Sequence, residues 1–100
     1  MEREERKQLK ATYQKAFLAV REIINEIDPY GLIHIGALND EFDAEVAEIL
    51  AGLKTCNTTQ EATELANKVF IKWFDEPLTK GEENCLLGEK LMNVKHLIRN

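Results

Sequence analysis

The chain has 100 residues, of which 44% are hydrophobic and 31% charged, so it is long enough for one domain with one modest core. Its 18 acidic and 13 basic residues give a net charge of −5, which argues against nucleic acid or an anionic membrane as the main partner. The sequence contains no serine, which excludes every mechanism based on a serine nucleophile. We expect a single domain over residues 1–100.

The first predicted helix covers about residues 4–27. Its apolar residues recur at intervals of three and four, which places them in one stripe along a helix, and its first two turns carry almost only charge and should stand clear of the core. The helix has to end before Pro29, because proline disfavours the helical conformation of the residue that precedes it. Asp28 is typical of an N-cap, so we expect a short helical turn at 30–35 that stops at Gly36. A short strand over residues 32–35 is the alternative, which we disfavour because no second strand is available to pair with it.

Two further helices are predicted in the middle of the chain. Acidic residues open the segment 40–53, where they complement the positive end of a helix dipole. Thr58 and Glu61 have the spacing of a capping box and predict the start of the next helix. That helix has the clearest apolar stripe in the chain, and it places Trp73 and Phe74 in the core. The alternative is that Trp73 is partly exposed and anchors a partner.

A last helix is predicted near the end of the chain. Thr79 and Glu82 repeat the capping-box spacing before it. Gly88 lies inside this helix and is expected to weaken it by about 1 kcal/mol relative to alanine. The predicted fold is therefore all-α, a compact bundle of four main helices plus a short helical turn.

The distribution of charge is the most informative feature for function. Between Glu22 and Leu53 the chain contains no lysine or arginine. The acidic residues of this stretch are Glu22, Glu26, Asp28, Asp40, Glu41, Asp43, Glu45 and Glu48. Helix capping accounts for single residues such as Asp28 and Asp43, but it does not account for the missing basic residues. We expect the eight acids to form one negative surface.

A negative surface of this kind fits a basic protein partner, because complementary charge raises the association rate and adds specificity. Nuclease active sites are basic because they hold phosphates, so a small acidic protein that covers one would block its substrate. The leading hypothesis is therefore an immunity protein that occludes a cognate toxin in the cytoplasm, since the chain begins without an apolar signal segment. Replacing Glu41 and Asp43 by lysine is expected to weaken toxin binding.

Catalysis and metal binding have little support in the sequence. The acidic residues do not follow the spacing of a calcium loop, and no glutamate stands three positions before His34 or His96. Cys56 and Cys85 do not form a C-x-x-C pair, and we expect both to be reduced thiols. We therefore expect no metal or other cofactor. A small enzyme that uses His34 with Asp40 or Glu41 would require a pocket around that histidine.

The middle of the chain resembles a known family. The run 28–33, the pair Gly36 and Ala37, the run 40–45 and the late aromatic cluster are similar to the YugE-like family of small bacterial helical domains of unknown function. This resemblance implies an all-helical fold and assigns no activity. Similar small domains occur among the immunity proteins of bacterial toxin systems, including contact-dependent growth inhibition, which agrees with the leading hypothesis.

The alternative is a non-catalytic adaptor or regulatory domain of the YugE-like kind, with an unknown protein partner. A toxin gene upstream of the gene for this chain would favour immunity over this alternative. We expect a monomer or a weak homodimer, because apolar residues left uncovered on the first helix could pair with a second copy.

Overall fold

The computed structural model describes residues 3–28, 31, 35–36, 40–81 and 83–98. The helices are α1 (Arg3–Ile27), α2 (Asp43–Leu53), α3 (Thr59–Phe74) and α4 (Glu83–Ile98), and no strand occurs among the described residues. The prediction of an all-α bundle with four main helices is confirmed.

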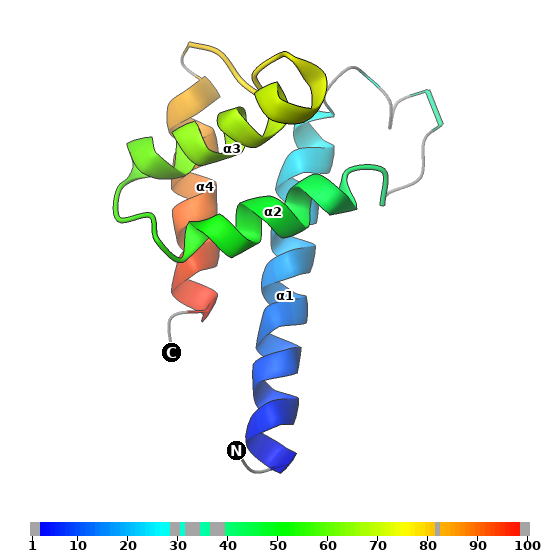
Figure 1. Cartoon of the computed structure of the whole chain (residues 1–100), viewed down its shortest axis with the longest axis vertical. Helices are drawn as coiled ribbons and strands as arrows, with labels where there is room; N and C mark the ends of the chain where they lie inside the picture. The colour runs from blue at the N-terminus through cyan, green and yellow to red at the C-terminus, as the bar shows by residue number, and fades with distance from the viewer. Residues whose placement is uncertain (1–2, 29–30, 32–34, 37–39, 82, 99–100) are drawn as a thin grey trace.

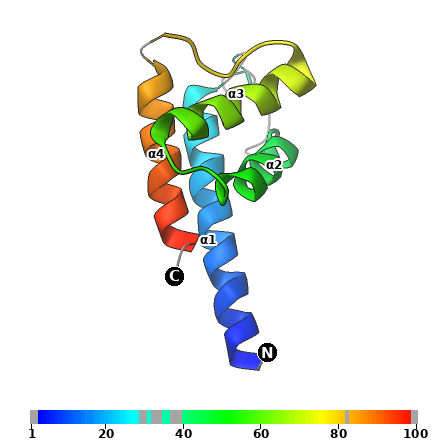
Figure 2. The ribbon, with the colours of Figure 1, turned by 60° about the vertical axis from the view of Figure 1, so that its left-hand side comes forward.

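The four helices form two crossed layers. Helices α1 and α4 run side by side in opposite directions, and α2 and α3 lie across them (Figures 1 and 2). The N-terminal turns of α1 extend beyond the other helices (Figure 1), as the charged beginning of the sequence predicts. The bundle therefore covers only the later part of the first helix.

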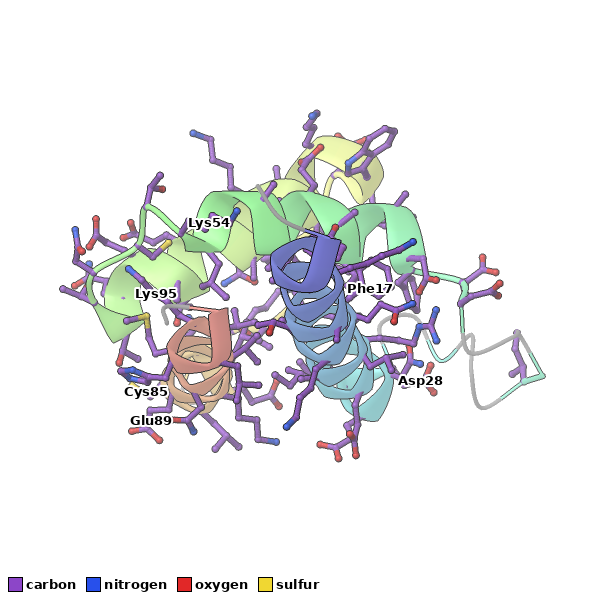
Figure 3. The ribbon with its side chains drawn as sticks, turned by 90° about the horizontal axis from the view of Figure 1, so that it is seen from below. Phe17, Asp28, Lys54, Cys85, Glu89 and Lys95 are labelled. Atoms are coloured by element: carbon purple, nitrogen blue, oxygen red, sulfur yellow. The ribbon has the colours of Figure 1, made fainter. Side chains whose placement is uncertain are left out.

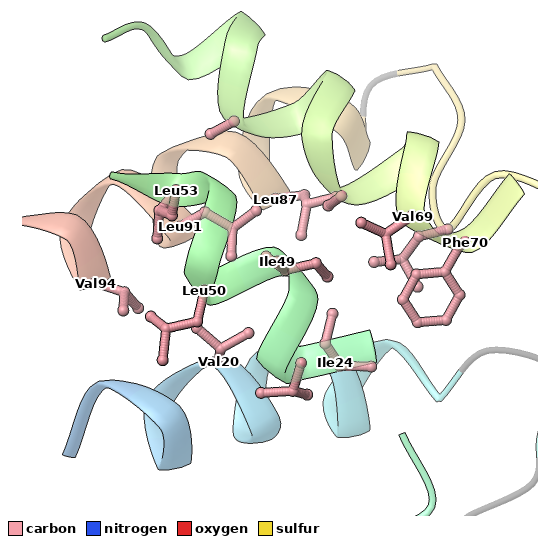
Figure 4. Packing of buried hydrophobic residues seen from close by; sticks show 14 of the residues in the cluster. Val20, Ile24, Ile49, Leu50, Leu53, Val69, Phe70, Leu87, Leu91 and Val94 are labelled. Carbon is pink, nitrogen blue, oxygen red and sulfur yellow. The ribbon is translucent and has the colours of Figure 1, made fainter. Parts of the chain in front are cut away.

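The core lies where the four helices meet, and each helix contributes the apolar stripe predicted from its sequence (Figure 4). Fully buried side chains from the four helices include Val20, Ile24, Ile49, Leu50, Leu53, Phe70, Leu87 and Leu91. Burying one such side chain contributes about 1.5–3 kcal/mol, so this cluster supplies most of the free energy that holds the helices together.

Side chains and backbone geometry define the two ends of α3. The hydroxyl of Thr58 accepts a hydrogen bond from the backbone N–H of Glu61 at 3.1 Å, and the Glu61 carboxylate accepts one from the N–H of Asn57 at 3.0 Å. Asp75 takes a left-handed conformation with φ 61°, and its N–H donates to the carbonyl of Ile71 at 2.9 Å. The predicted capping box at Thr58 is confirmed.

Asp28 lies at the junction between α1 and the turn that follows it. Its φ is 50°, and its N–H donates to the carbonyl of Ile24 at 2.9 Å, which ends α1. Its own carbonyl accepts from the N–H of Gly31 at 2.9 Å, which begins a short helical turn. Most of the helical turn predicted at 30–35 lies outside the described residues.

Helices α3 and α4 cross closely at Gly88. A Cβ atom added to Gly88 would lie 2.4 Å from the carbonyl oxygen of Thr59 and 2.3 Å from the hydroxyl of Thr63. That hydroxyl donates to the backbone carbonyls of Thr59 and Asn84, at 3.0 and 2.7 Å. Gly88 is thus required by packing, which reverses the interpretation that it only weakens the helix.

A group of polar side chains extends this contact to the loop before α4. Thr79 is buried; its N–H donates to Oδ1 of Asn67 at 2.9 Å and its hydroxyl to Oδ1 of Asn84 at 2.5 Å. Because α4 begins at Glu83, Thr79 is not its N-cap, and the predicted capping box at Thr79 is wrong. The other half of that motif, Glu82, lies outside the described residues.

Candidate partner-binding surface

Three of the eight predicted acidic residues pair with basic side chains of neighbouring helices. The closest nitrogen–oxygen distances are 2.5 Å for Arg21–Asp43, 3.0 Å for Lys72–Glu48 and 3.3 Å for Lys90–Glu26. All three basic residues lie outside the stretch 22–53. Folding therefore brings cations to part of this stretch, and the eight acids do not form one uniformly solvated negative surface.

The pair of Arg21 and Asp43 holds the beginning of α2 against α1. Nε and Nη2 of Arg21 donate to Oδ1 and Oδ2 of Asp43, at 2.9 and 2.5 Å, which is a bidentate geometry. Arg21 also lies over the ring of Phe17, with 5.5 Å between Cζ and the ring centroid. The hydrogen bonds to Asp43 raise the pKa of Arg21; the charges of Asp43 and Asp40 act in the same direction, and desolvation opposes them. Asp43 is therefore committed to a contact within the molecule.

The acids of the set that lie outside α2 occupy separate parts of the surface. Glu22 and Glu26 face a shallow groove between α1 and α4. Asp28 is partly buried at the end of α1, whereas Asp40 and Glu41 are exposed immediately before α2. The structure thus brings Asp40 and Glu41 together with the α2 acids and leaves Glu22 and Glu26 on a different groove.

Glu45 is the one buried member of the set. It is 7% exposed, and among the described residues its Oε2 atom has no hydrogen-bond partner. Glu45 shares a face of α2 with Glu48 and Gly52, because these positions are three and seven residues apart. This face lies on α3, since Glu48 pairs with Lys72 and a Cβ on Gly52 would lie 2.7 Å from Leu65.

The end of α3 carries aromatic side chains at the surface. Trp73 is 53% exposed and Phe74 36%, so the prediction that Trp73 belongs to the core is wrong. Phe70 and Phe74 are four positions apart and both contact Phe42, with ring centroids 5.9 and 6.2 Å away. These two phenylalanines fill the inward side of the last turn, which leaves the Trp73 ring at the surface.

The contact between Phe42 and Phe74 brings acidic residues from two distant segments to one end of the molecule. Asp40 and Glu41 precede Phe42, and Asp75 and Glu76 follow Phe74; all four are exposed. We call Asp40, Glu41, Trp73, Asp75 and Glu76 the acidic–aromatic end. Sequence reasoning missed Asp75 and Glu76 because only the tertiary contact between the two phenylalanines joins the segments.

The described residues offer little for catalysis or metal binding. No group of three histidine, cysteine or acidic side chains lies close enough to hold a metal ion in this part of the chain. His34 lies outside the described residues, and His96 is exposed on α4. Burial raises the pKa of the Cys56 thiol, with a further contribution from the charge of Glu61, which disfavours the reactive thiolate. Cys85 is exposed on α4 (Figure 3).

Comparison with known proteins identifies no relative: no protein family, curated protein or solved structure matches this chain significantly. The resemblance to the YugE-like family and to immunity proteins therefore stays a prediction. No helix in the described part of the chain has an apolar run long enough to cross a membrane.

Proposed function

We propose that this protein is a non-catalytic binding protein that docks onto a basic protein partner, and that the partner is a toxin which it neutralises as an immunity protein. The observation that carries this proposal is the acidic–aromatic end, where an exposed tryptophan and four exposed carboxylates flank, in sequence, the two phenylalanines that join the segments. Tryptophan is enriched among the residues that dominate protein–protein affinity, and surrounding charge directs the approach of a partner.

The arrangement favours occlusion of the toxin over any chemical action. Asp40, Glu41, Asp75 and Glu76 are exposed, so their field reaches into solvent and accelerates association with a cationic surface. The ring of Trp73 offers a large apolar area that loses contact with water on binding. A basic nuclease covered by this end would be blocked both sterically and by competition with the phosphates of its substrate.

The structure also changes the choice of test variant. Asp43 is held by Arg21, so lysine at position 43 would disturb the junction of α1 and α2 as well as any interface. Replacing Asp40 and Glu41 by lysine reverses two exposed charges and keeps both partners of the Arg21–Asp43 pair. Binding to the proposed basic toxin, measured by calorimetry, should weaken at least about tenfold at low salt. The loss should shrink as salt screens the charges.

A matched control carries the same change of charge on another part of the surface. Glu64 on α3 and Glu89 on α4 are exposed, and Figure 3 shows Glu89 on the α4 side of the molecule, away from the beginning of α2. Replacing both by lysine should leave the affinity within about twofold of the parent protein. Equal losses in the two double variants would refute the proposed surface. Failure of the parent protein to restore growth of toxin-expressing cells would refute immunity and favour the adaptor alternative.

A further inference from the structure

The seam between α2 and α3 has the features of a site for one more cation. Three contacts set the register of the two antiparallel helices: Gly52 lies opposite Leu65, Glu48 opposite Lys72, and Phe42 opposite Phe74. Glu45 lies between Phe42 and Glu48 along α2, so it is opposite the last turn of α3, at the level of Trp73. We call Glu45, Glu48 and Trp73 the α2–α3 seam.

The seam already holds one cation that belongs to the chain. Nζ of Lys72 lies 3.0 Å from Oε1 of Glu48 and 5.4 Å from the centroid of the Trp73 ring. The ammonium group of Lys72 thus pairs with one of the two carboxylates of the seam. Among the described residues no basic side chain pairs with Glu45, and its buried Oε2 accepts no hydrogen bond. A buried carboxylate oxygen without a donor costs free energy in the isolated protein, which a ligand with suitable donors would recover.

A guanidinium group fits this seam better than a second ammonium group. It is planar, so it can stack on the exposed face of an indole ring while its N–H groups donate in the ring plane to a carboxylate. It is also less strongly hydrated than an ammonium group and is the cation favoured at buried interfaces. Trp73 is 53% exposed, so about half of it is open to such a group.

We propose that the α2–α3 seam receives an arginine side chain of the protein partner, which donates to Glu45 and stacks on Trp73. This inference rests on the proposed function for the nature of the partner and deepens it by naming the recognised group. It also explains why a carboxylate is kept at a buried position where the isolated protein gives it no donor.

The chain offers a direct probe of the seam, because Trp73 is its only tryptophan. The single indole N–H signal in a ¹H–¹⁵N spectrum, and the intrinsic fluorescence, both report on this ring. Titration with the blocked peptide acetyl-Gly-Arg-Gly-amide should move the indole signal in a saturable manner. The same peptide with citrulline, a neutral isostere of arginine, should bind at least about tenfold more weakly. An equal response to the two peptides, or no response to either, would overturn the inference.

Two variants separate recognition from folding. Glu45→Gln should lose at least about tenfold in affinity for the arginine peptide while its Tm stays equal to that of the parent or rises. Glu22→Gln removes an exposed carboxylate on the α1–α4 groove and should bind the peptide like the parent protein. Unchanged peptide affinity in Glu45→Gln would contradict the proposal that Glu45 binds the arginine side chain. The arginine–citrulline comparison needs only the parent protein, so it decides the matter even if a variant does not fold.

This experiment is independent of toxin neutralisation. If the seam does not bind the arginine peptide, the inference is refuted, and the proposed function then depends on the acidic–aromatic end alone. A seam that binds arginine in a protein that fails to protect cells keeps the inference and refutes immunity.

Discussion

Replacement of Gly88 by alanine tests the packing of α3 against α4. The new methyl group would lie 2.4 Å from the carbonyl oxygen of Thr59, a backbone atom that cannot rotate away, and 2.3 Å from the hydroxyl of Thr63. Overpacking of this kind costs about 3 kcal/mol at the upper end of its usual range, while alanine recovers about 1 kcal/mol of helix propensity. The net loss of about 2 kcal/mol should lower Tm by roughly 8–16 °C in a domain of this size.

Thermal unfolding followed by circular dichroism measures this change, and Gly52 supplies the control. A Cβ atom on Gly52 would meet Cδ1 of Leu65 at 2.7 Å, but that atom ends a flexible side chain that can change rotamer. Gly52→Ala should therefore alter stability by less than about 1 kcal/mol, since helix propensity offsets the small strain. A Gly88→Ala protein as stable as the parent would refute the close crossing of the helices.

Three further outcomes are expected. Thr58→Ala removes the hydroxyl that accepts from the Glu61 N–H and should cost about 1 kcal/mol of unfolding free energy, measured in urea. Arg21→Met and Asp43→Asn should each lower the free energy of unfolding, and a double-mutant cycle should show that the two losses are coupled. Additive losses would mean that the bidentate pair contributes nothing to stability. With a thiol reagent, the exposed Cys85 should react at once, whereas Cys56 should react only through unfolding, because it is buried and burial raises the pKa of its thiol. A single fast phase for both thiols would contradict the burial of Cys56.

The periodic parts of the sequence predict the fold well, for a simple physical reason. An apolar stripe with a spacing of three and four has to face a core, and Val20, Ile24, Leu87 and Leu91 are all buried as their spacing predicts. The capping box at Thr58 is equally local, because its donor and acceptor groups lie within one turn. Local patterns of this kind need no knowledge of the neighbouring helices.

The errors fall where tertiary contacts decide the role of a residue. Gly88 looks unfavourable in a helix until the backbone of α3 is placed against it. Trp73 continues an apolar stripe, but Phe70 and Phe74 already fill the inward side of that turn. Helix periodicity shows which side of a helix is apolar. It does not show how much of that side the neighbouring helices cover.

The candidate site could be predicted only in part. The stretch without lysine or arginine draws attention to the region around α2, where Asp40 and Glu41 are exposed. The basic residues that pair with acids of this stretch come from other helices, as the ion pair of Glu48 with Lys72 illustrates. No pattern within the stretch reveals these basic residues. The contribution of Asp75 likewise depends on a contact between two aromatic residues far apart in sequence.

Hydrogen–deuterium exchange on the complex with the proposed basic toxin tests the central claim most directly. Docking through the acidic–aromatic end and the α2–α3 seam predicts slower exchange in residues 40–48 and 70–76 when the toxin is bound. Exchange in residues 84–95 of α4 should stay the same as in the free protein. Protection confined to α4 or to the N-terminal turns of α1, with 40–48 and 70–76 unchanged, would contradict the account.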